Sequence, residues 1–172
     1  MDLFKVGDKV IYPNQGIGLI ESVQVESFDG ESFKAYGVRL LSTNTLVVVP
    51  SSSAEEMGIR KPVSESSVKK IFDYLRSGAV DVTMNWKGRY KEHINLMKSG
   101  TILDMVLVLK SLYYLSLIKP LSFREKRMME KVKELVVSEI SEAACLPCTQ
   151  IEQKVNTTLA LCFKNNKTGL ND

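Results

Sequence analysis

The spacing of apolar residues changes once along the chain, after the run Ser51-Ser52-Ser53. Before this run, short apolar segments alternate with turn residues, which predicts β-strands because strand side chains point to two faces in turn. After it, apolar residues recur every three or four positions between capping residues, which predicts α-helices. The sequence therefore predicts an α+β protein of two domains, a small β-domain followed by an all-α bundle.

The first domain, at residues 1–60, has the pattern of a small, bent antiparallel barrel of the SH3-like or Tudor-like type. Strands are predicted at residues 9–12, 17–25, 33–41 and 45–49. Gly18 permits a sharp bend, and Asp29-Gly30 has the sequence of a hairpin turn because both residues tolerate positive φ. Residues 46–49 carry no charge, so this strand is either covered within the domain or is a docking edge for another sheet.

The second domain, at residues 64–163, is predicted to be a bundle of about five helices, and residues 164–172 a frayed tail. Helices are predicted at residues 68–76, 81–99, 101–117, 122–140 and 147–163. Ser122 and Glu125 have the spacing of a capping box, and Pro147 fits the first turn of the last helix. The most apolar stretch contains Asp104 and Lys110, which favours a buried helix over a membrane span.

Charge is divided unevenly between the two parts of this 172-residue chain. Residues 1–65 hold six basic and nine acidic residues, whereas residues 66–172 hold 17 basic and 11 acidic residues. We expect any polyanion to meet the second part. The start of the chain lacks the pattern of a signal peptide, and three cysteines argue against a disulfide framework, so we expect a cytoplasmic protein.

The only tryptophan, Trp86, lies in the basic segment 85–91, which reads Asn-Trp-Lys-Gly-Arg-Tyr-Lys. Cations at Lys87, Arg89 and Lys91 suit phosphates, and an indole can stack on a base or insert into a base step. The residues alone leave two interpretations open. Either Trp86 touches nucleic acid, or it anchors the start of a helix to the core beside a solvated basic face.

Three segments together resemble a known family. Residues 4–13 read Phe-Lys-Val-Gly-Asp-Lys-Val-Ile-Tyr-Pro and are followed by Gly16 and Gly18. With the segment 85–91 and the later Leu-Ser-Phe-Arg-Glu-Lys-Arg-Met at 121–128, the chain resembles the CarD/CdnL family of bacterial transcription factors over most of its length. The opening alone is shared with the polymerase-interacting domain of transcription-repair coupling factors, so the tryptophan segment makes the resemblance specific.

The resemblance implies that the Tudor-like domain docks on the β subunit of RNA polymerase and that the helical domain reaches the upstream fork of the promoter bubble. It implies that Trp86 is a wedge in the minor groove, and the other DNA contacts are Lys87, Arg89, Tyr90 and Lys91. Such contacts favour the open promoter complex. We expect weak DNA binding by the free protein, because the polymerase supplies most of the local concentration.

Two departures from the family pattern affect the site. Gly88 stands where relatives often carry arginine, so one backbone contact is expected to be missing. Some relatives use arginine at the positions of Glu26 and Val48, whereas others have an apolar residue with proline at Pro50, and this chain follows the apolar version. Together with Val47, these three residues are the predicted polymerase contacts, and an apolar surface depends less on salt than an arginine-based one.

Other candidate sites are weaker. Cys145 and Cys148 have the spacing of a redox pair or half a zinc site, but the only histidine, His93, is distant in sequence, so we interpret the pair as packing or chance. We interpret His93 as a surface residue. Lys69-Lys70 and residues 124–127 either extend a phosphate-binding face or are solvated surface. Since no nucleophile, base and orienting group combine, we expect no enzyme, cofactor or metal.

Two hypotheses follow. The first is a monomeric transcription regulator that reaches the nucleoid through RNA polymerase, contacts promoter DNA near the upstream edge of the bubble, and has no membrane partner. The second is an adaptor whose β-domain binds polymerase or another partner while the bundle contacts no DNA. An exposed Trp86 favours the first hypothesis and a buried Trp86 favours the second.

Overall fold

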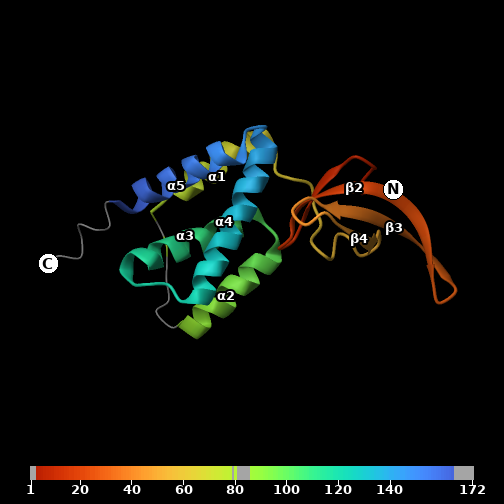
Figure 1. The fold of residues 1–172 in the computed structure, drawn as a ribbon, viewed down its shortest axis with the longest axis horizontal. Coiled ribbons are helices and arrows are strands. Elements are labelled where there is room, and N and C mark those ends of the chain that lie inside the picture. The colour runs from red at the N-terminus through yellow and green to blue at the C-terminus, as the bar shows by residue number, and fades with distance from the viewer. Residues whose placement is uncertain (1–2, 79, 81–85, 165–172) are drawn as a thin grey trace. The chain divides into compact units, whose positions relative to one another are not determined.

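The computed structural model describes residues 3–78, 80 and 86–164, without the side chain of Trp86. The chain divides between Pro62 and Val63 into two compact units. Among the described residues, the first unit holds a four-stranded sheet and the second holds five helices (Figure 1). The predicted α+β class, a small curled β-domain followed by a helical bundle, is therefore confirmed.

The sheet of the first unit is antiparallel, and its strands pair in chain order. The strands are β1 (Lys9–Tyr12), β2 (Gly16–Phe28), β3 (Glu31–Leu40) and β4 (Thr45–Pro50). The β2–β3 hairpin turns at Asp29 and Gly30, whose φ values of 52° and 81° confirm the predicted turn. The register shifts between Ile20 and Ser22, as in a β-bulge, which bends β2 and curls the sheet into a half-barrel.

The core of this unit collects apolar side chains from all four strands and from the segments that flank the sheet. Its buried members are Phe4, Val10, Ile20, Tyr36, Val38, Leu40, Val49, Ala54 and Ile59. Gly18 allows close strand packing, since a Cβ there would lie 2.6 Å from Cγ1 of Val38. The register shift of β2 lies two residues further on, after Ile20.

The helices of the second unit are α1 (Glu65–Arg76), α2 (Trp86–Ser99), α3 (Ile102–Ile118), α4 (Phe123–Ala144) and α5 (Cys148–Lys164). The apolar helix α3 contacts the other four, which explains why its sequence is apolar on nearly every side. Pro147 directly precedes α5 instead of lying in its first turn. Within the described ranges, no helix has the length and apolar character needed to cross a membrane.

Lys110, the cation in the middle of α3, is fully buried. Its ammonium donates to the carbonyl oxygens of Tyr74 and Ser77, at 2.8 and 2.5 Å, and to Oγ of Ser77 at 2.9 Å. These acceptors lie at the C-terminal end of α1, where unpaired carbonyls and the helix dipole favour a cation. A buried charge on α3 therefore caps α1 and fixes the two helices to each other.

Candidate nucleic-acid interface

An open groove of about 430 Å³ lies between α2 and the first turns of α4. Its lining combines aromatic, apolar and basic side chains: Tyr90, Ile94, Met97, Phe123, Arg124, Arg127, Met128 and Lys131. Phe123 is 72% exposed, and the Arg127 guanidinium lies 5.7 Å from the centroid of its ring. Exposed rings beside cations suit the sugar and phosphate surfaces of nucleic acid.

Three of the predicted DNA contacts lie on one face of α2. Lys87, Tyr90, Lys91 and Ile94 are spaced so that they share one helix face, and Tyr90 and Ile94 line the groove. Lys87 and Lys91 are exposed, whereas Tyr90 is half-buried against the core. The helix α2 therefore carries two cations and one aromatic ring on the same face.

Trp86 is the first residue of α2, and its side chain lies outside the described part of the structure. The prediction that this indole is exposed as a wedge stays a prediction. Gly88, two residues later, is exposed, and a Cβ built on it meets no atom within 4 Å. A residue with a side chain would therefore fit at this position without a clash at its Cβ.

Arg89 differs from its basic neighbours because it points into the bundle. Its side chain is only 2% exposed, and Nη2 donates to Oε1 of Glu125 at 2.6 Å. A guanidinium that is buried and paired with a carboxylate is poorly accessible to a phosphate. The role of Arg89 as a DNA contact stays an untested prediction, and because of this burial and pairing we leave Arg89 out of the proposed DNA contacts.

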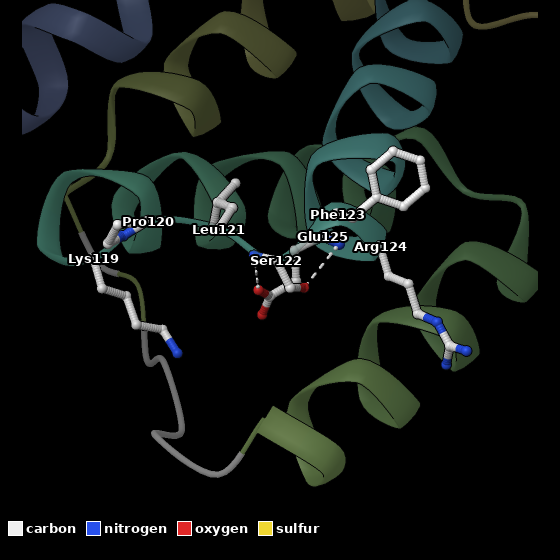
Figure 2. A pocket seen from close by; sticks show the side chains of 7 residues that line it. All are labelled: Lys119, Pro120, Leu121, Ser122, Phe123, Arg124 and Glu125. Carbon is white, nitrogen blue, oxygen red and sulfur yellow. Dashed lines mark hydrogen bonds between the residues drawn. The ribbon is translucent and has the colours of Figure 1, made fainter.

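Glu125 belongs to the capping box at the start of α4, as the sequence predicted. The backbone N–H of Ser122 donates to Oε2 of Glu125 at 2.9 Å, and the N–H of Glu125 donates to Oγ of Ser122 at 3.3 Å. Figure 2 shows the Glu125 carboxylate folded back on Ser122, while Phe123 and Arg124 point away from it. These side chains line a second cavity, of about 610 Å³, made by residues 119–125.

The surroundings of Glu125 keep its carboxylate ionised. Burial raises its pKa, but hydrogen bonds from Arg89 and Ser122 and the charge of Arg89 lower it by more, to about 2. A carboxylate that stays charged in a buried place holds the Arg89 guanidinium firmly, because ionised hydrogen-bond partners interact more strongly than neutral ones. Arg89 and Glu125 thus form a permanent ion pair between α2 and α4 at physiological pH.

His93 lies one turn after Arg89 on the same face of α2 and is also buried, with 4% of its side chain exposed. The prediction of a surface histidine is wrong. Its pKa falls from 6.5 to about 4, chiefly because burial disfavours the charged imidazole; the positive charge of Arg89 contributes to the fall, and Glu125 opposes it. The imidazole is therefore neutral at physiological pH, and His93 is part of the bundle interior.

In the β-domain, the predicted polymerase contacts are not all on one surface. Val48 is 54% exposed on β4, an edge strand, and Leu46 on the same face is 47% exposed. Val47 points the other way and packs against the core, and Pro50 is half-buried. Glu26 on β2 pairs with Phe33, four residues along β3 from Gly37, the partner of Val48. The strand register therefore places Glu26 away from Val48 along the sheet.

The two cysteines with metal-site spacing lie at the end of α4 and the start of α5. Cys145 and Cys148 are exposed free thiols, and Cys145 takes a left-handed conformation (φ 52°) that ends α4. In the described ranges, no three His, Cys, Asp or Glu side chains are grouped as metal ligands would be. The spacing of the pair reflects the turn between two helices.

The sequence interpretation missed the Arg89–Glu125 pair. The available signal was the spacing of Arg89, His93 and Met97, which puts two polar residues on the face that a buried methionine shares. The second signal was Glu125 itself, because an acidic residue in a capping box beside a basic segment is a ready ion-pair partner.

Comparisons with known proteins match both units. The family model described as CarD-like/TRCF RID domain matches residues 4–63, and the model described as CarD, C-terminal domain, matches residues 70–156. YdeB of Bacillus subtilis (strain 168), described as a candidate transcription factor, is 30% identical over 138 residues, covering 80% of this chain and 90% of YdeB. The NMR structure of the 72-residue N-terminal domain of Myxococcus xanthus CarD is 31% identical and covers 34% of this chain and 77% of that domain, with a TM-score of 0.30.

Proposed function

Because this chain belongs to the CarD family of transcription factors, we propose that it binds the β subunit of RNA polymerase and stabilises the open promoter complex. The β-domain is the polymerase-binding part. The helical domain contacts promoter DNA at the upstream edge of the bubble through Trp86 and basic side chains.

The polymerase contact is an apolar patch on the edge strand β4, centred on Val48 and continued by Leu46 and Pro50. An edge strand with exposed apolar side chains is suited to pairing with a strand of another protein. Val48 and Leu46 are about half exposed and carry no charge, so they fit an apolar partner surface. We retain Glu26 and Val47 as weaker candidates, because Val47 packs against the core.

The single observation that carries the DNA contact is the basic, aromatic-lined groove between α2 and α4. Arg124 and Arg127 line its α4 side, and the exposed Lys87 and Lys91 share the helix face of the groove residue Tyr90 on α2. Four cations on two neighbouring helices can bind successive phosphates and orient the first turn of α2 toward the duplex. Trp86, at the start of that turn, is then the residue that reaches the fork.

A wedge at the fork stabilises the open complex because its contact exists only while the strands are separated. Unstacking a base step costs a few kcal/mol, and a contact of similar size made only in the melted state shifts the equilibrium toward melting. Polymerase binding by the β-domain supplies the local concentration, so a weak DNA contact is sufficient.

The test replaces Trp86 by alanine and measures the lifetime of open complexes after a competitor challenge with the homologous polymerase. We expect Trp86→Ala to bind the polymerase normally and to shorten this lifetime, and Trp86→Phe to retain part of the effect because a smaller ring still fills part of the step. The thermal stability of each variant is the control, since truncating a core tryptophan typically costs about 3–5 kcal/mol.

A large loss of thermal stability in Trp86→Ala, or an unchanged open-complex lifetime, would contradict the wedge. Either result would favour the adaptor hypothesis, in which the bundle contacts no DNA.

A further inference from the structure

The described side chains in the first turn of α2 are mostly exposed. Lys87 and Gly88 are exposed, and a Cβ built on Gly88 meets no atom within 4 Å. Glycine inside a helix lowers its stability by about 1 kcal/mol relative to alanine. The buried apolar contact of this helix, Met97, lies in its last turns. Among the described side chains of the first turn, Arg89 is the one that is buried.

The first turn also carries the wrong charge for its position. The N-terminus of a helix has a partial positive charge, and α2 begins with Lys87 and Arg89 and has no acidic residue in its first turn. Glu125 supplies the missing negative charge from α4, with Oε1 at 2.6 Å from Nη2 of Arg89. Its other oxygen accepts from the N–H of Ser122, so one carboxylate binds Arg89 near the start of α2 and the backbone at the start of α4.

Stability alone does not explain a buried ion pair at this place. Replacing such a pair by apolar residues of similar size is often neutral or stabilising, because desolvating two charges is costly. What an arginine–carboxylate hydrogen bond adds is direction, because an N–H group donates along a narrow range of angles, whereas apolar contacts have no preferred direction. The pair therefore fixes the orientation of the first turn of α2 relative to the first turn of α4.

We propose that Arg89 and Glu125 are positioning residues that hold the first turn of α2, and with it Trp86, against the N-terminus of α4. This inference rests on the proposed function, in which Trp86 is the DNA wedge. Without the pair, the first turn frays, and binding at the fork has to order it again. The groove-lining cations Arg124 and Arg127 flank Glu125 on α4, so the pair also sets their distance from the first turn of α2.

The chain provides a selective probe, because Trp86 is its only tryptophan. Time-resolved fluorescence anisotropy of the free, full-length protein reports how freely this one residue moves on the nanosecond timescale. We compare Glu125→Gln, which keeps side-chain size and an acceptor for Ser122, with Arg89→Met, which removes the guanidinium. The control Val155→Ala truncates a fully buried residue of α5 and destabilises the bundle without touching α2.

We expect a larger fast component of the anisotropy decay in Glu125→Gln and Arg89→Met, and the wild-type decay in Val155→Ala. Ser122→Ala, which removes the cap hydroxyl and leaves the pair, is also expected to keep the wild-type decay. Wild-type decay in Glu125→Gln, or an equal change in Val155→Ala, overturns the proposal. If circular dichroism shows that Arg89→Met does not fold, the anisotropy decay of Glu125→Gln alone still tests the proposal.

The second readout is the open-complex lifetime with polymerase. We expect Glu125→Gln to shorten it about tenfold, as when a binding-competent state becomes about tenfold less populated, with polymerase binding intact. A lifetime that falls in Trp86→Ala and stays unchanged in Glu125→Gln overturns the positioning role. An unchanged lifetime in Trp86→Ala refutes the proposed function instead, while the anisotropy of the free protein still tests whether the pair holds Trp86.

Discussion

Because the imidazole of His93 is buried, we expect the protein to lose stability in mildly acidic solution. In the unfolded chain, the histidine binds a proton with a pKa near 6.5, whereas burial lowers this pKa to about 4 in the folded protein, with Arg89 adding to the shift and Glu125 opposing it. Between these two pH values the unfolded state binds more protons than the folded state. The stability is therefore fully present above pH 6.5 and is lost as the pH falls toward 4.

The size of the effect follows from the two pKa values. Their difference corresponds to about 3 kcal/mol when the pH lies below both, and linkage gives a loss of about 2 kcal/mol at about pH 5 relative to about pH 8. Small domains have about 5–15 kcal/mol of unfolding free energy, so this loss is readily measured. Glu125 acts in a lower window, because its pKa falls from 4.5 unfolded to about 2 folded, and its contribution is lost below pH 4.5.

The assay is urea unfolding at a series of pH values between 5 and 8, which stays above the window of Glu125. His93→Leu, which cannot titrate, is expected to show a much flatter pH dependence. NMR titration of the single histidine provides a direct check, and Arg89→Met should raise its midpoint by removing a neighbouring positive charge. A midpoint near 6.5 in the folded wild type, or an equal slope in His93→Leu, would refute the reasoning.

Two further predictions address the proposed contacts. Val48→Glu puts a charge on an exposed position of β4, so we expect normal folding and weaker binding to the polymerase β subunit in a pull-down. The matched control is Val25→Glu, at a 73% exposed position of β2. Equal binding by both variants would remove Val48 from the interface. Replacing Lys87 and Lys91 by alanine is expected to reduce the slope of open-complex stability against log salt by about 2, with Lys69 and Lys70 on α1 as the matched control pair. An unchanged slope in the first pair would make those lysines ordinary solvated surface.

The fold could be predicted from the sequence because its local signals agree with one another. The hairpin turn at Asp29-Gly30 and the capping box at Ser122 and Glu125 each depend on residues close in sequence, and both are present. The register shift after Ile20 could not be predicted in this way. A bulge depends on how two distant strands pair, and the period of the apolar residues carries no information about it.

The site was harder to predict because the presence of a charged residue in the sequence does not reveal which way its side chain points. Lys87, Arg89 and Lys91 look like one basic patch when read in order, but a helix turns about 100° per residue. Lys87 and Lys91, one turn apart, share the groove side, whereas Arg89 falls between them in sequence and points into the bundle. Only the position of Glu125, 36 residues further on, determines what that inward arginine meets.

This division of the basic segment explains how residues 87–91 can be anchored to α4 and still present cations for the proposed DNA contact. If all three cations faced the DNA, the first turn of α2 would have no buried contact among its described side chains and a repulsive charge at its N-terminus. With Arg89 turned inward, Glu125 neutralises that end and anchors it to α4, while Lys87 and Lys91 remain exposed. Arg124 and Arg127, on either side of Glu125 in the sequence, then supply cations from the second helix. In the proposed interface, the phosphate-binding charge thus comes from two helices that the buried Arg89–Glu125 ion pair connects.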